Sequence, residues 1–161
     1  MDQALLHVMI NHWRGMYKVL ESDWQAVAKE TGVTPAELHV LWILSLEVQA
    51  TMSRIAELGL WDLSTVAQMI NRLKKKEMIK TKKKNKDRRI SYCELTPLGK
   101  EKAEESKAHS YKFLDYLKEQ EDKNNDISII EQLRDFQVKF NRHFHGKDFV
   151  DWVDETAKQL P

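Results

Sequence analysis

The sequence predicts a mainly helical fold that contains two short helices joined by a tight turn and one small β-hairpin. Three observations support this prediction. Apolar residues recur at helical spacing through most of the 161 residues, and only five Gly and three Pro are available to interrupt helices. Strand-like alternation is confined to residues 78–95. The length suits a single globular unit.

Positive charge is concentrated in one part of the chain. Residues 72–89 hold eleven basic and two acidic side chains, a net charge of +9. The remaining residues hold fifteen basic and twenty-three acidic side chains, a net charge of −8, so the chain as a whole carries only +1. Such an asymmetry favours a polyanionic partner.

Neither a signal peptide nor a membrane span is evident in the sequence. The N-terminus lacks a basic segment, and the densest apolar run, residues 40–44, is too short to cross a bilayer. The single cysteine, Cys93, cannot form an intramolecular disulfide or supply a multi-thiolate zinc site. We therefore expect a cytoplasmic protein with no membrane partner.

The first third of the chain predicts two helices. Apolar residues at helical spacing extend over residues 5–28, and Gly32 can end this helix. Thr34 and Glu37 form a capping box around a proline, which predicts a second helix over residues 35–48. Apolar residues occupy nearly every side of this second helix, so we expect it to be buried centrally.

Residues 53–76 predict the two short helices of a helix-turn-helix. Ser53 is positioned to cap the first helix, which Gly59 ends, and Asp62 is positioned to cap the second. The second helix has one apolar stripe and an opposite face that can donate to phosphates or base edges. This arrangement is typical of a DNA-binding helix-turn-helix. The polar face consists of Ser64, Thr65, Gln68, Asn71, Arg72 and Lys75.

The hairpin follows, and helices complete the chain. Strands are expected over residues 78–84 and 88–95, around a basic tip. Thr96 is positioned to cap one continuous helix that runs to about Glu121. A polar loop comes next.

The last part of the chain predicts two further helices. A capping box at Ser128 begins the first, and Gly146 ends it. Asp148 is positioned to cap the final helix.

A set of positions between Ser53 and Gly99 falls in register across the two short helices, the hairpin and the start of the next helix. These positions are Ser53, Ile55, Ala56, Gly59, Ser64, Thr65, Val66, Arg72, Leu73, Met78, Ile79, Asp87, Arg88, Arg89, Leu95, Thr96 and Gly99. They resemble the MarR-type winged helix-turn-helix transcription regulators. The segment from His145 to Phe149 also resembles the Bacillus-type repressors of exoprotease production and sporulation within that family.

The resemblance implies a winged helix-turn-helix DNA-binding domain over residues 34–96 and a helical dimerisation domain over residues 1–33 and 97–161. It implies a homodimeric, sequence-specific repressor that binds a pseudo-palindromic operator in double-stranded DNA, with half-sites about one helical turn apart. It implies no cofactor. An enzyme is not expected, because no phosphate-binding glycine loop, nucleophile elbow or paired carboxylates stand out.

The resemblance also assigns DNA contacts to the second short helix. Ser64, Thr65 and Gln68 are expected to meet base edges in the major groove, where glutamine can pair with adenine through two hydrogen bonds. Arg72 and Lys75 lie further along and are expected to hold phosphates.

The remaining expected contacts lie at the start of the first short helix and at the hairpin tip. Free N–H groups at a helix N-terminus favour phosphate. By the resemblance, Asp87 braces Arg89 while Lys86 and Arg88 approach the minor groove, whose negative potential attracts arginine. The expected DNA contacts in these two places are Ser53, Arg54, Lys84, Lys86, Asp87, Arg88 and Arg89.

Two other functions are compatible with the same residues. A non-specific or architectural DNA-binding protein would use the +9 segment on phosphates alone. A protein-interaction module would use the winged helix to hold an acidic partner. Preference for one duplex sequence over random duplexes separates a repressor from both.

Four aromatic residues, Trp13, Tyr17, Trp42 and Phe113, are candidates for a pocket that binds a small aromatic effector. In the resembling regulators, inducers commonly bind where the dimer and DNA-binding domains meet. The alternative is that these residues belong to the core or to the dimer interface.

Three further residue types have simpler interpretations. Cys93 could sense oxidants, but it alternates in phase with Leu95 on a strand and is expected to be a packing residue. The six histidines lack the spacing of a chelating pair, so no metal is expected. Glu77 stands where the resembling proteins often have Gly, so we expect the helix-to-strand turn to be built differently here.

Overall fold

The computed structural model describes residues 2–84, 87–123 and 128–160, with only the backbone described at residues 84, 87–89, 122 and 123. Helices account for most of this part of the chain. The helices are α1 (Gln3–Thr31), α2 (Pro35–Glu47), α3 (Met52–Gly59), α4 (Leu63–Lys75), α5 (Pro97–Lys107), α6 (Lys112–Lys123), α7 (Ile129–His145) and α8 (Lys147–Ala157). The strands are β1 (Gln49–Thr51), β2 (Ile79–Lys84) and β3 (Asp87–Leu95).

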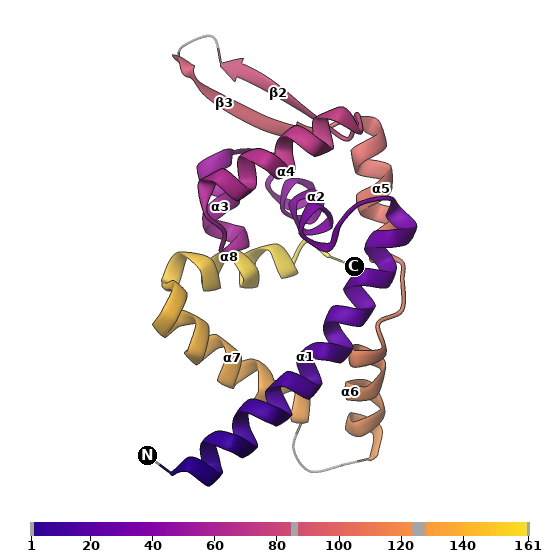
Figure 1. Ribbon diagram of the computed structural model, residues 1–161, viewed down its shortest axis with the longest axis vertical. Helices are drawn as coiled ribbons and strands as arrows, with labels where there is room; N and C mark the ends of the chain where they lie inside the picture. Colours follow the sequence, from indigo (N-terminus) through magenta and orange to yellow (C-terminus); the bar gives the residue numbers. More distant parts are fainter. Residues whose placement is uncertain (1, 85–86, 124–127, 161) are drawn as a thin grey trace.

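The molecule is elongated, with the β2–β3 hairpin at one end and the N-terminal half of α1 at the other (Figure 1). The strands form one antiparallel sheet in the order β1–β3–β2. Helices α2, α3 and α4 lie next to the sheet, and α1 runs from them to the far end, where α6 and α7 lie beside it (Figure 1). Helix α8 folds back beneath α2 and α3.

Helix α2 forms the centre of the core, as its apolar residues on all sides predicted. Five of its apolar side chains are at most 1% exposed, and they pack with the apolar stripes of α3 and α4. The fully buried residues of α2 are Leu38, Val40, Leu41, Ile43 and Leu44.

Local signals predicted most helix starts correctly. Thr34 and Glu37 form the expected capping box, and Asp62 and Thr96 accept backbone N–H groups at the starts of α4 and α5. Gly32 adopts the left-handed conformation, with φ 78°, and ends α1. These features depend on residues within a few positions of one another, which explains their visibility in the sequence.

The prediction of one continuous helix from Thr96 to about Glu121 was wrong, because the chain breaks between α5 and α6. Contacts with α1 stabilise the break. The backbone N–H of Phe113 donates to Asp23 Oδ2 at 3.1 Å, and the Tyr111 ring lies 6.3 Å from that of Trp24. A distant carboxylate therefore accepts a hydrogen bond from the start of α6.

The helix ends around α3 and α8 also differ from prediction. Thr51, not Ser53, caps α3 by accepting the backbone N–H of Arg54, because the unpredicted strand β1 places Thr51 there. The left-handed residue after α3 is Leu60, with φ 56°, and Gly59 is the last helical residue. Gly146, not Asp148, occupies the N-cap position of α8.

The turn from α4 to β2 contains Glu77, at the position where we expected a turn that differs from that of the resembling proteins. Glu77 adopts the left-handed conformation with φ 58°. Its N–H donates to Lys74 O at 3.0 Å, and its carbonyl accepts the Thr96 hydroxyl at 2.6 Å. These bonds offset the strain of a non-glycine residue there.

No helix in residues 2–84, 87–123 and 128–160 is both long enough and apolar enough to span a membrane.

We predict that Gly99→Ala destabilises the fold. A Cβ at Gly99 would lie 2.0 Å from the Met78 carbonyl oxygen, so the start of α5 would have to move away from the α4–β2 turn. The expected loss is about 3 kcal/mol in the free energy of unfolding, measured by urea denaturation at one protein concentration.

Gly15→Ala is the matched control, because a Cβ at Gly15 meets no atom within 4 Å. Alanine in a helix interior should raise stability by about 0.5–1 kcal/mol. Equal effects of the two substitutions would contradict the close approach at Gly99.

Candidate nucleic-acid interface

The start of helix α4 is organised by the carboxylate of Asp62. It accepts the backbone N–H of Thr65 at 2.8 Å and the hydroxyls of Ser64 and Thr65 at 2.5 and 2.7 Å. These hydrogen bonds hold the pKa of Asp62 well below its ordinary range. Each hydroxyl has only one hydrogen, so in this arrangement Ser64 and Thr65 can accept from bases but not donate to them.

One row of side chains on α4 points away from the core. Ser64, Gln68, Asn71 and Lys75 follow each other at helical spacing and are all exposed, opposite the buried apolar stripe. Within the described residues, the side chains of Gln68 and Asn71 make no hydrogen bond, so both amides are available to base edges. The sequence placed Asn71 on the polar face but gave it no base contact. In the structure it lies in the same exposed row as Ser64 and Gln68, which are expected to contact bases.

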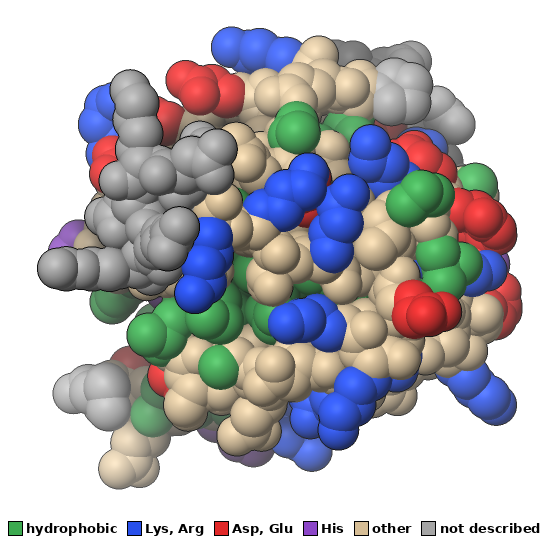
Figure 2. All heavy atoms as spheres, turned by 90° about the horizontal axis from the view of Figure 1, so that it is seen from above, with side chains coloured by type: hydrophobic (Ala, Val, Ile, Leu, Met, Phe, Trp, Pro, Cys, Tyr) green, Lys and Arg blue, Asp and Glu red, His purple; other side chains and the backbone are tan. Residues whose placement is uncertain are grey.

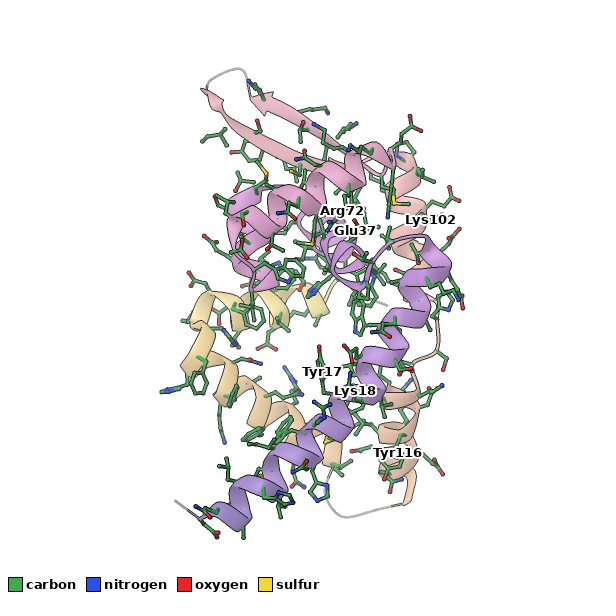
Figure 3. The ribbon with its side chains drawn as sticks, in the orientation of Figure 1. Tyr17, Lys18, Glu37, Arg72, Lys102 and Tyr116 are labelled. Carbon is green, nitrogen blue, oxygen red and sulfur yellow. The ribbon has the colours of Figure 1, made fainter. Side chains whose placement is uncertain are left out.

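Arg72 is anchored by a buried glutamate. Its Nε donates to Glu37 Oε1 at 2.8 Å, while Lys76 Nζ donates to Glu37 Oε2 at 2.8 Å (Figure 3). The Glu37 side chain is 1% exposed, whereas that of Arg72 is 52% exposed. The terminal nitrogens of Arg72 therefore remain free to donate to a phosphate while Nε is held in place.

The Glu37 carboxylate joins helix α2 to helix α4. Burial acts to raise its pKa, but hydrogen bonds from Lys76, the Thr34 backbone N–H and Arg72 outweigh burial and lower the pKa below its ordinary value. Sequence reasoning recognised Glu37 only as part of a capping box. An acidic residue on an otherwise apolar helix was the signal that could have indicated its second role.

The hairpin carries a row of lysines next to α4. Lys82 Nζ lies 2.7 Å from Glu94 Oε1 and Lys80 lies 4.0 Å from Glu94 Oε2, while Lys83 is exposed. The hydrogen bond from Lys82 lowers the pKa of Glu94. Seen from the hairpin end, Lys and Arg side chains are spread over this face of the molecule (Figure 2).

Five of the expected hairpin contacts have side chains outside the described residues. The backbone pairs β2 with β3 and sets Lys84 opposite Asp87, which confirms a hairpin at this position. The predicted roles at its tip remain predictions. These residues are Lys84, Lys86, Asp87, Arg88 and Arg89.

The start of α3 offers one free and one engaged side chain. Ser53 is exposed in the first turn. Arg54 lies 3.5 Å from Glu47 and 3.7 Å from Glu57, so it would have to leave these carboxylates to reach a phosphate. Ser53 is therefore the better placed of the two for DNA.

Comparison with known proteins identifies this architecture. Residues 33–91 match the model of the MarR family. The transcriptional regulator Hpr of Bacillus pumilus is 35% identical over 88 residues, covering 55% of this chain and 43% of that protein. Hpr of Bacillus licheniformis is 28% identical over 157 residues, covering 91% of this chain and 71% of that protein. Over residues 33–91 the chain is therefore similar to the MarR family.

A solved structure agrees with this fold. The regulator AbsC of Streptomyces coelicolor superposes with a TM-score of 0.72 at 17% identity, covering 91% of this chain and 98% of that one. The mainly helical winged helix-turn-helix predicted from the sequence is thus confirmed. The match to Hpr proteins of Bacillus species agrees with the resemblance to Bacillus-type repressors.

The aromatic residues considered for an effector pocket lie in separate places. Trp42 packs on Trp24, with ring centroids 5.0 Å apart, and donates from Nε1 to Ser106 Oγ at 2.7 Å. The ring centroid of Trp13 instead lies 6.0 Å from that of Phe136, and Trp13 lines a hollow of about 480 Å³ beside α7.

The other two aromatic candidates lie away from that hollow. Tyr17 is 60% exposed, and Phe113 is half-buried at the start of α6. The structure therefore does not gather the four predicted residues around the hollow beside Trp13, and the effector remains a prediction.

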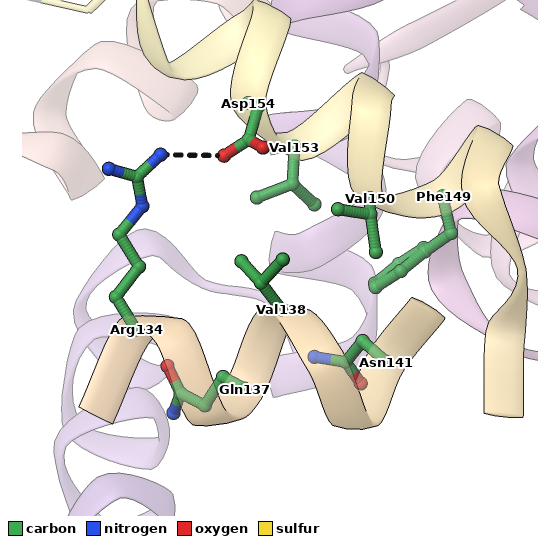
Figure 4. A pocket seen from close by; sticks show the side chains of 8 residues that line it. All are labelled: Arg134, Gln137, Val138, Asn141, Phe149, Val150, Val153 and Asp154. Carbon is green, nitrogen blue, oxygen red and sulfur yellow. Dashed lines mark hydrogen bonds and ion pairs between the residues drawn. The ribbon is translucent and has the colours of Figure 1, made fainter. Parts of the chain in front are cut away.

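A smaller hollow of about 130 Å³ separates α7 from α8 (Figure 4). Val138, Val150 and Val153 line it, and the ion pair between Arg134 and Asp154, at 3.0 Å, lies at one side. It lies at the packing between these two helices. Among the described residues, no group of three or more His, Cys, Asp or Glu could hold a metal ion.

Cys93 is a residue of the hydrophobic core. Its side chain is fully buried, and burial raises the pKa of the thiol to about 11. A protonated, inaccessible thiol is a poor target for oxidants, so the structure supports the packing role.

We predict that Glu37→Gln lowers stability in a pH-dependent way. Because the folded-state pKa of Glu37 lies below its unfolded value, ionisation stabilises the fold above about pH 4.3, and this contribution disappears as pH falls through the folded-state pKa. The variant should lose about 2 kcal/mol at pH 7, and the difference should shrink below pH 4.

Urea denaturation across pH measures this difference. Glu57→Gln is the control, because Glu57 is 68% exposed and its pairing with Arg54 should contribute less than about 0.5 kcal/mol. A pH-independent effect of Glu37→Gln would exclude the ionised carboxylate as the cause.

Proposed function

We propose that this chain is a sequence-specific transcriptional repressor that binds a pseudo-palindromic DNA operator as a homodimer. The exposed row of uncharged polar side chains on α4, flanked by lysines and arginine, carries the proposal. Uncharged amides read base edges, whereas the surrounding positive charge supplies affinity for phosphates. The chain spans less than half the length of Hpr from Bacillus pumilus, so the regulatory activity in that protein's name is extended to this chain as a proposal.

In this proposal residues 34–96 form the DNA-binding domain, and residues 1–33 and 97–161 form the dimerisation domain. Gln68 forms hydrogen bonds with a base, and the hydroxyl oxygens of Ser64 and Thr65 accept hydrogen bonds from base edges in the major groove. Arg72, held by Glu37, contacts a phosphate. Further backbone and minor-groove contacts come from Ser53, Arg54, Lys75, Lys84, Lys86, Arg88 and Arg89, with Asp87 bracing Arg89.

The dimer interface is assigned to α1 and α7, at the end of the molecule away from the hairpin (Figure 1). Trp13 is 45% exposed on α1, and Phe136, Phe140 and Phe144 are 50%, 48% and 62% exposed on α7. The three phenylalanines form a continuous ladder with centroid spacings of 6.1 and 4.6 Å. A stripe of aromatic rings left open to water fits an interface with a second copy.

We predict that selection of bound duplexes from a random pool yields a two-fold symmetric sequence. The selected duplex should bind roughly 10³-fold more tightly than random DNA at physiological salt, since base contacts add to the phosphate contacts. A non-specific binder or a protein-interaction module would show no such preference. If the selected duplexes share no sequence, the proposal that this chain is a sequence-specific repressor is refuted.

We predict that Phe140→Asp shifts the protein from dimer to monomer, because an unpaired carboxylate would be buried in the phenylalanine ladder. Sedimentation equilibrium measures the change, and affinity for the full operator should fall at least tenfold because two half-sites are no longer engaged together. Tyr116→Asp is the control, since Tyr116 is 60% exposed on α6. A dimeric Phe140→Asp variant would place the interface elsewhere.

A further inference from the structure

The first residue of the reading helix is an exposed leucine. Leu63 begins α4 and is 53% exposed, although Leu58 and Leu73 of the same helix-turn-helix are at most 2% exposed. The neighbouring Trp61 turns inward, where its ring lies 5.3 Å from that of His39 and packs against the core. The turn is thus anchored by Trp61, and Leu63 is left facing outward.

Leu63 belongs to the DNA-facing end of the molecule and not to the proposed dimer interface. Helix α4 lies next to the hairpin, while the exposed aromatic stripe of α7 lies toward the opposite end (Figure 1). Leu63 and Ala67 are one helical turn apart, so they form an apolar edge beside the polar row that includes Gln68. The N-terminal residues of a recognition helix are those that approach base edges.

Hydrogen bonding at the first turn leaves few donors there. The hydroxyl hydrogens of Ser64 and Thr65 both go to Asp62, and these are the only hydroxyls in the first turn of α4. The side chains that the first turn presents to a groove are therefore one apolar group and two hydroxyls that can only accept. The thymine C5-methyl group is the apolar feature of the major groove, and adenine N6 and cytosine N4 are its donors.

We propose that Leu63 packs against the C5-methyl group of a thymine in each half-site and is a specificity-determining residue of the interface. This inference rests on the proposed DNA-binding function and deepens it by naming one base that the helix start recognises. Thymine is favoured over the other three bases because it alone carries a methyl group at that edge. Leu63 thereby adds selectivity that the basic segment, which binds phosphates of any sequence, does not supply.

The test replaces thymine by deoxyuridine, which removes only the methyl group. Each thymine of the selected half-site is substituted in turn, symmetrically in both half-sites, and the dissociation constant of the unchanged full-length protein is measured. At one thymine position, binding should weaken about fourfold per half-site, the value expected for exposing one methyl group. Leu63→Ala should bind the thymine and deoxyuridine duplexes equally.

Lys75→Ala is the matched control on the same helix. It removes a phosphate contact, so it should weaken binding to both duplexes by the same factor and keep their ratio unchanged. Because Leu63 is exposed, Leu63→Ala should unfold at the same urea concentration as the unchanged protein.

Three results would overturn the inference about Leu63 without contradicting the proposed repressor function. These are a selected half-site without thymine, equal binding of thymine and deoxyuridine duplexes at every position, or an undiminished methyl effect in Leu63→Ala. Failure to select any sequence would overturn both the inference about Leu63 and the proposed repressor function. The measurements on the unchanged protein decide whether a thymine methyl group is contacted, and the Leu63→Ala variant decides whether Leu63 makes that contact.

Discussion

The buried carboxylate of Glu37 is the interaction on which the placement of the reading helix depends. It accepts hydrogen bonds from the start of α2 and from Arg72 and Lys76 of the α4 region. Lys76 also donates to Gly32 O at 3.0 Å, which ties the end of α4 to the end of α1. A buried, ionised group tolerates little displacement, because each lost bond leaves charge without solvation. Helix α4 is thereby fixed in angle relative to the core.

The reading helix is also held at its other end, by aromatic contacts. His39 of α2 lies between Trp24 of α1 and Trp61 of the α3–α4 turn, with ring centroids 5.8 and 5.3 Å apart. Burial lowers the pKa of His39, which favours the uncharged ring in this stack. Packing from α1 to the start of α4 gives the proposed dimer helix a direct mechanical connection to the turn that precedes Leu63.

These supports divide the proposed DNA-binding surface into parts with different chemistry. Asp62 engages the hydroxyls at the helix start, Glu37 holds one edge of Arg72, and the amides of Gln68 and Asn71 remain unengaged between them. In the proposed function, the amides and Leu63 supply specificity, while lysines of the hairpin contribute positive charge. The conspicuous basic run is the less selective part of this surface.

The sequence by itself determined the helices, the hairpin and the concentration of charge, because caps such as Thr34 and Asp62 and the apolar periodicity act within a few residues. Only the tertiary structure decided the break before α6, where Asp23 accepts a bond from a residue 90 positions away. The same holds for the pairing of Glu37 with Arg72, 35 positions apart. Long-range contacts override local propensity wherever a buried polar group must find a partner, and no local pattern specifies which partner that is.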